Sequence, residues 1–190
     1  SEIPHSERRW IPVFGGMTVF AFGLAIAFVL FPPPLNRVLA PGSVLVTARD
    51  GTPLRAFADE RGVWRFAVHV DEVAPVYIDT LLAYEDRWFY RHAGVNPVSL
   101  LRAIWQGLSS GEVVSGGSTL TMQVARLLEP IPRTLPGKLK QCWRALQLEA
   151  RFSKHEILEM YLNLAPFGGT IEGVQAASYA YLGKPASRLS

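Results

Sequence analysis

One acidic residue occupies an unusual place, in the stretch LLAYEDRWFYRHAGV at residues 81–95. Glu85 falls at helical spacing among apolar residues, with leucines one turn before it and Trp88 and Phe89 one turn after it. No basic residue lies three or four positions away, so no local salt bridge satisfies the acid. Because an apolar setting disfavours a carboxylate, an acid kept there costs stability and suits a general base. We therefore take Glu85 as a candidate for chemistry.

A second polar set follows a glycine-rich loop, in SSGEVVSGGSTLTMQVARLL at residues 109–128. Ser118 is the expected N-cap of a helix. Thr119, Gln123 and Arg126 then fall at i, i+4 and i+7 and form a polar stripe beside the apolar face. A helix N-terminus with such donors attracts anions, phosphates especially, although a Gly-Gly-Ser start is also common as simple capping. The stripe is thus a candidate anion-binding surface.

A third stretch, at residues 137–169, predicts a helix, a break near Ser153 and another helix that Ser153 caps. Glu149 lies on the expected core face of the first helix, with no basic residue one turn away, and is a second candidate carboxylate. The single cysteine excludes an intramolecular disulfide framework and is expected to be a buried, inert thiol. That expected core face comprises Leu139, Cys142, Trp143, Leu146 and Ala150.

The first element that must help to position these residues is an uncharged segment at residues 11–31. As a helix with a rise of about 1.5 Å per residue it would be about 30 Å long, which is enough to span the core of a bilayer. Basic residues before it favour a cytoplasmic N-terminus at residues 1–10. A cleaved signal peptide and a buried core helix are the alternatives. Residues 32–70 are expected to form a Pro-rich linker and a small β meander over 44–70. The remainder is mainly α, with helices at about 75–90, 97–109, 118–129, 137–152, 154–163 and 172–181.

Composition narrows the class of partner. The formal charge of +3 is mild, and no zinc spacing, Walker loop or RNA-binding signature occurs, so a nucleic-acid partner is not expected.

Four ordered motifs carry a resemblance: EDRWFYRHAG (85–94), GGSTLTMQVAR (116–126), KHEILEMYLN (154–163) and GVQAASYAYLGK (173–184). They resemble those of family 51 peptidoglycan glycosyltransferases, the glycan-polymerising domains of bifunctional penicillin-binding proteins. The resemblance implies a lysozyme-like fold over residues 71–190 and a lipid II substrate. It also implies a single-pass type II protein of the bacterial inner membrane with a periplasmic catalytic part. Because the chain stops without a closing element, we expect a fragment that lacks the transpeptidase domain.

The resemblance assigns roles to the site residues. Glu85 corresponds to the general base that activates the acceptor's 4-hydroxyl, and Asp86 and His92 shape the site. The expected substrate-binding residues are Ser118, Thr119, Gln123, Arg126 and Lys138. No metal ligand is expected and no cofactor is certain, with a divalent cation (Mg²⁺ or Mn²⁺) left open. The expected partners are lipid II, the growing glycan strand and inner-membrane lipid, with other cell-wall synthesis proteins also open.

Two positions depart from the family pattern. Gly137 stands where the family usually has Arg, and Gln141 stands where it has a second glutamate, whereas Lys138 is retained. The departure at Gln141 supports one alternative, a weakly active or non-catalytic membrane-anchored scaffold. The other alternative is a lysozyme-like glycan-cleaving enzyme that uses Glu85 with Glu149.

Overall fold

The computed structural model describes residues 22–40, 42–97 and 118–190, which fall into two compact units, residues 1–32 and 33–190. In the first unit, residues 22–30 are helical. Among the residues that the structure describes, no helix is long and apolar enough to cross a membrane. Most of the expected anchor at 11–31 lies outside the described residues, as does the helix expected at 97–109.

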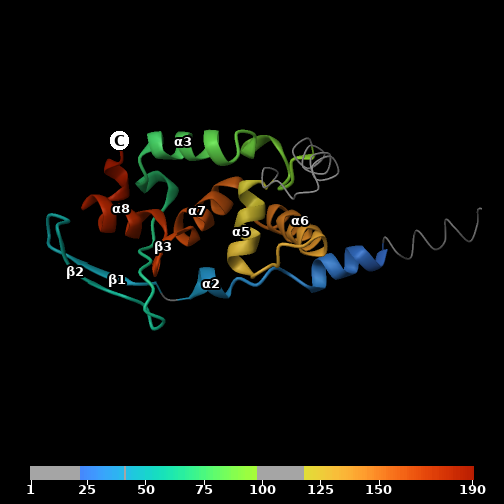
Figure 1. Cartoon of the computed structure of the whole chain (residues 1–190), viewed down its shortest axis with the longest axis horizontal. Coiled ribbons are helices and arrows are strands. Elements are labelled where there is room, and N and C mark those ends of the chain that lie inside the picture. Colours follow the sequence, from blue (N-terminus) through green and yellow to red (C-terminus); the bar gives the residue numbers. More distant parts are fainter. Residues whose placement is uncertain (1–21, 41, 98–117) are drawn as a thin grey trace, which may run out of the picture. The chain divides into compact units, whose positions relative to one another are not determined.

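The second unit is mainly helical, as predicted (Figure 1). α5 (Leu120–Leu128) contacts both α6 (Leu135–Glu149) and α7 (Lys154–Leu164), and these three helices hold most of the core. The other helices that the structure describes in this unit are α2 (Asn36–Leu39), α3 (Pro75–Glu85) and α8 (Val174–Leu182), with 3₁₀ turns η2 (Val70–Glu72), η3 (Phe89–Arg91) and η4 (Ala186–Arg188).

The predicted β meander over 44–70 is wrong in its third strand. β1 (Val44–Thr47) and β2 (Pro53–Phe57) pair antiparallel, but residues 63–70 do not extend that sheet. Instead the Trp64 amide donates to the Thr170 carbonyl at 2.8 Å, and the Trp64 carbonyl accepts from the backbone at 2.9 Å beside a second hairpin. That hairpin comprises β3 (Pro166–Gly168) and β4 (Ile171–Glu172). The local pattern predicted that residues 63–70 pair with β2, but the backbone of Trp64 pairs with the distant hairpin instead.

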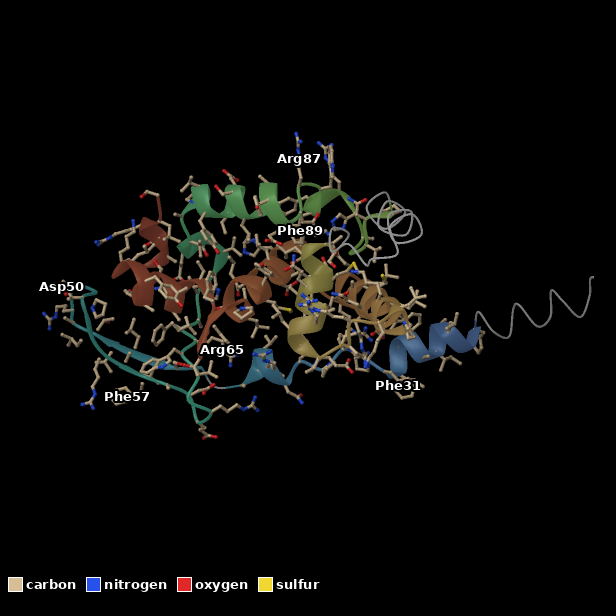
Figure 2. All side chains as sticks on the ribbon, viewed as in Figure 1. Phe31, Asp50, Phe57, Arg65, Arg87 and Phe89 are labelled. Carbon is tan, nitrogen blue, oxygen red and sulfur yellow. The ribbon has the colours of Figure 1, made fainter. Side chains whose placement is uncertain are left out.

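The core comprises large side chains from α5 and α7, closed by Leu148 of α6 and by Phe89 (Figure 2). In Figure 2 Phe89 lies among the helices, whereas Arg87, two residues earlier, points outward. Burying each of these apolar side chains stabilises the fold by about 1.5–3 kcal/mol. Residues of this core include Leu120, Val124, Leu128, Ile157, Leu158 and Leu162.

The expected core face of α6 is wrong. Leu139 is 66% exposed and Leu146 is 41% exposed, while Ala150 is exposed as well. The buried residues of this helix are Gly137, Gln141, Ala145, Gln147 and Leu148. Its glycine and alanine let α6 approach its neighbours closely, and the amides of Gln141 and Gln147 are hydrogen-bonded, so apolarity alone does not mark the buried side of this helix.

Candidate active site

Glu85 is the last residue of α3, and its side chain is exposed. We expected an apolar, partly dry helix face; this is wrong because the helix ends at Glu85, where the side chain reaches an open pocket. Its carboxylate accepts a hydrogen bond from Nε2 of Gln123 at 2.8 Å. The pocket has a volume of about 390 Å³ and lies between α3, α5 and the end of α7. It is lined by Tyr77, Leu81, Glu85, Gln123, Arg126, Leu127, Tyr161, Ala165, Pro166 and Phe167.

Asp86 follows Glu85 as the C-cap residue of α3 and, unlike Glu85, is buried. Its carboxylate accepts from the backbone amide of Leu120 at 2.9 Å and contacts Nε2 of His92 at 3.0 Å. Because Nδ1 of His92 accepts from the amide of Gly94, the hydrogen-bond network assigns the ring proton to Nε2, which donates to Asp86. The acid next to Glu85 thus ties the end of α3 to the first residue of α5, the helix that carries Gln123.

The two hydroxyl residues before α5 have roles other than those expected. Thr119, not Ser118, caps the helix, because its Oγ1 accepts from the amide of Met122 at 3.1 Å. Thr119 is buried and also donates to the carbonyl of Gly94, so it does not join a stripe with Gln123 and Arg126 on the pocket. The Thr119 hydroxyl is held by the Gly94 carbonyl. Because Thr119 is the cap of α5, the Ser118 hydroxyl is free to make another contact.

Lys138 takes up that contact. Its Nζ donates to Oγ of Ser118 at 2.6 Å and to Oε1 of Gln141 at 3.3 Å. Burial lowers the pKa of Lys138, the neighbouring Cys142 partly offsets this, and the nearby charge of Arg126 lowers the pKa again. Arg126 lines the Glu85 pocket, whereas Lys138 is not one of its lining residues. The two cations, from α5 and α6, lie close enough for their charges to interact.

The departure at residue 137 has a steric explanation. A Cβ on Gly137 would lie 2.1 Å from the carbonyl oxygen of Pro132. The Gly137 amide also donates to Oγ1 of Thr134, which caps α6. The chain before α6 therefore passes too close for the arginine that the family pattern predicts at this position.

Glu149 is committed elsewhere. Its Oε1 accepts from Oγ1 of Thr121 at 2.6 Å and from Nζ of Lys154 at 2.7 Å. Lys154 lies five residues along the chain, beyond the break at Ser153, so counting one helical turn did not reveal it. Glu149 is a structural ion-pair member and does not line the Glu85 pocket.

Two tyrosines of the pocket were missed as site residues. Tyr77 lies on the same face of α3 as Leu81 and Glu85, at i, i+4 and i+8, which was a usable signal. Burial, with a contribution from Glu85, raises the pKa of Tyr161 to about 12 and also raises the pKa of Tyr77. Both phenols are therefore neutral hydrogen-bonding groups beside the carboxylate.

Among the described residues, the donor atoms do not form a protein cage for a divalent cation. Within the described ranges, no group of three or more His, Cys, Asp or Glu side chains is placed to hold a metal ion. At residue 141 an amide replaces a carboxylate, and its oxygen already accepts from the ammonium of Lys138.

Known proteins are similar to this chain. Residues 50–190 match the transglycosylase family. The chain is 60% identical over 161 residues to penicillin-binding protein 1C of Escherichia coli, covering 85% of this chain and 21% of that protein. It is 39% identical to penicillin-binding protein 1A of Aquifex aeolicus, covering 66% of this chain and 18% of that protein. It is 37% identical to penicillin-binding protein 1A of Escherichia coli, covering 76% of this chain and 17% of that protein. The chain thus spans about a fifth of the length of these relatives.

Proposed function

The chain belongs to the transglycosylase family of the penicillin-binding proteins, and from that membership and the geometry around Glu85 we propose that it is a peptidoglycan glycosyltransferase of cell-wall synthesis. The proposed reaction polymerises lipid II into glycan strands with release of undecaprenyl diphosphate. The observation that carries the proposal is the carboxylate of Glu85, hydrogen-bonded by Gln123 in a pocket that Arg126 also lines.

In the proposed mechanism Glu85 acts as general base on the 4-hydroxyl of the acceptor sugar. The hydroxyl oxygen forms a bond to the anomeric carbon of the donor, the bond from that carbon to the diphosphate oxygen breaks, and Glu85 receives the proton. Arg126 and Lys138 offset the negative charge that develops on the leaving diphosphate. The Gln123 amide orients the carboxylate, and the Asp86–His92 pair holds the ends of α3 and α5 together.

Turnover of lipid II by the purified protein tests this proposal. We expect polymeric glycan and released undecaprenyl diphosphate from lipid II, and no cleavage of finished cell wall. Cleavage of finished wall without polymerisation would favour the glycan-cleaving alternative. That alternative needs a second carboxylate, and its candidate Glu149 is bound by Lys154 and Thr121.

The scaffold alternative has its own supporting observation in the departures at Gly137 and Gln141. Lipid II binding without turnover by a folded protein would favour it. Two observations support the glycosyltransferase instead: the close approach of Pro132 at Gly137 and the hydrogen bonds of Gln141. Both residues fit closely into their surroundings, which is not expected of positions that have lost their role.

The proposed setting is the bacterial inner membrane. Residues 11–31 are the proposed anchor after a cytoplasmic tail at 1–10. Residues 32–70 are the proposed linker and β region, and 71–190 the proposed periplasmic glycosyltransferase domain. Its proposed partners are lipid II, the growing glycan strand, membrane lipid and other cell-wall synthesis proteins. A reporter fused at residue 40 tests the orientation: one that works only in the periplasm supports it, and one that works only in the cytoplasm contradicts it.

A further inference from the structure

Gln141 is buried, with 5% of its surface exposed, and both ends of its amide are engaged. Its Nε2 donates to the backbone carbonyl of Met122 in α5 at 2.6 Å. Its Oε1 accepts from Nζ of Lys138 at 3.3 Å. The carbonyl can only accept and the ammonium can only donate, so these partners fix which way the amide points.

An ionised glutamate could not make the same pair of contacts. A carboxylate has no donor for the Met122 carbonyl, and placing one there sets two acceptors against each other in a buried site. It would also form an ion pair with Lys138. The amide satisfies the ammonium with a neutral oxygen and leaves its full positive charge in place.

The surrounding acids do not neutralise Lys138 either. Glu129 is paired with Lys140 and Arg144, and Glu149 with Lys154. Over residues 22–40, 42–97 and 118–190, no carboxylate lies within ion-pair distance of Lys138. Burial disfavours the cation, Cys142 acts in the opposite direction, and the neighbouring charge of Arg126 disfavours the cation again. Because the pKa of Lys138 is lowered on balance, keeping it charged here costs stability.

We propose that Gln141 is a positioning residue that holds the ammonium of Lys138 against Ser118 with its charge uncompensated by any carboxylate of the described residues, so that this charge serves the anionic diphosphate of the donor. The inference rests on the proposed function. It assigns a role to the Gln141 amide itself, rather than treating the amide as a poorer substitute for the family's glutamate.

The test is Gln141→Glu in the full chain, assayed with lipid II at several ionic strengths. The variant keeps the shape of the side chain and supplies an acid to Lys138. We expect KM for lipid II to rise about tenfold or more, the equivalent of about 1.4 kcal/mol, and the salt sensitivity of KM to fall. Lys140→Gln is the matched control: it makes the same change in net charge one residue away, on a lysine bonded to Glu129. We expect its KM to stay near the wild-type value.

An unchanged KM in folded Gln141→Glu overturns the inference, and so does an equal rise in Lys140→Gln. If melting curves show that Gln141→Glu does not fold, a double-mutant cycle of Gln141→Met with Lys138→Met decides. The inference expects the two effects on KM to be coupled, and additive effects overturn it. Absence of turnover by the wild-type protein overturns the proposed function and the inference with it, whereas an unchanged KM in Gln141→Glu overturns the inference alone.

Discussion

Asp86→Asn tests whether the buried acid beside Glu85 holds the site together. In the folded protein the Asp86 carboxylate accepts from the Leu120 amide at 2.9 Å and from Nε2 of His92 at 3.0 Å. The asparagine side chain has the same shape but is neutral and has a single acceptor oxygen. With that oxygen in the place of Oδ2, it still accepts from the Leu120 amide and lies 3.0 Å from Nε2 of His92. The NH₂ group then takes the place of Oδ1, which is also 3.0 Å from Nε2, and faces the N–H of His92. The ring cannot change tautomer without losing its bond from Gly94.

The expected cost follows from these contacts. Replacing a charged acceptor by a neutral one and setting two donors face to face in a buried site costs about 1.5–3 kcal/mol. Against a total stability of about 5–15 kcal/mol this is a large fraction. For a domain of this size it corresponds to a fall in Tm of roughly 3–12 °C. Glycan polymerisation should fall as well, because α3 and α5 together place Glu85 and Gln123.

Urea unfolding and a melting curve of Asp86→Asn measure this cost. Asp79→Asn is the matched control: it makes the same chemical change on the exposed side of α3, and we expect its effect to stay within about 0.5 kcal/mol. A Tm for Asp86→Asn as high as that of the control would refute the argument that Asp86 joins the two helices.

Three further predictions concern other sites. Arg126→Ala should raise KM for lipid II by the equivalent of about 1.5–3 kcal/mol while Arg126→Lys stays mild, and equal, negligible effects would remove this residue from the site. Gly137→Ala should lower the free energy of unfolding, measured in urea, by about 1–3 kcal/mol, because its Cβ would clash with the Pro132 carbonyl. An unchanged urea midpoint would show that the backbone near Pro132 moves to make room. The hydrogen bond with Glu159 raises the pKa of His69 above 6.5, so its stabilisation is present below that value and is lost as the pH rises through the folded-state pKa. Glu159→Gln should therefore lower Tm more at about pH 5.5 than at about pH 8.5, and equal shifts would contradict this.

Local signals predicted much of the fold. The cap at Ser153 is confirmed, and the structure shows that it forms a capping box with Glu156. The helices on either side of it are confirmed as well, because a cap and its helix lie within a few residues. The third strand of the meander was not predictable in this way. Trp64 pairs near Ile171, more than a hundred residues along the chain, and no local pattern records that partner.

The site shows the same division. The position of Glu85 on the face of Leu81 and Tyr77 follows from helical spacing, but its exposure does not, because the turn of Asp86 toward α5 ends the helix there. Periodicity also misplaced the buried side of α6. Counting apolar residues favours Leu139, whereas the buried side of α6 includes small residues and two hydrogen-bonded amides, Gln141 and Gln147.

The central claim is that Glu85 does chemistry, and Glu85→Gln tests it most directly when a melting curve and a lipid II turnover assay are run on the same variant. The substitution keeps the shape and an acceptor oxygen for Gln123, so we expect Tm equal to or above that of the wild type. Lipid II binding should largely persist, because a general base acts mainly in the transition state. Polymerisation should fall by about 10²–10⁴. A folded Glu85→Gln protein that polymerises lipid II at near the wild-type rate would contradict the claim.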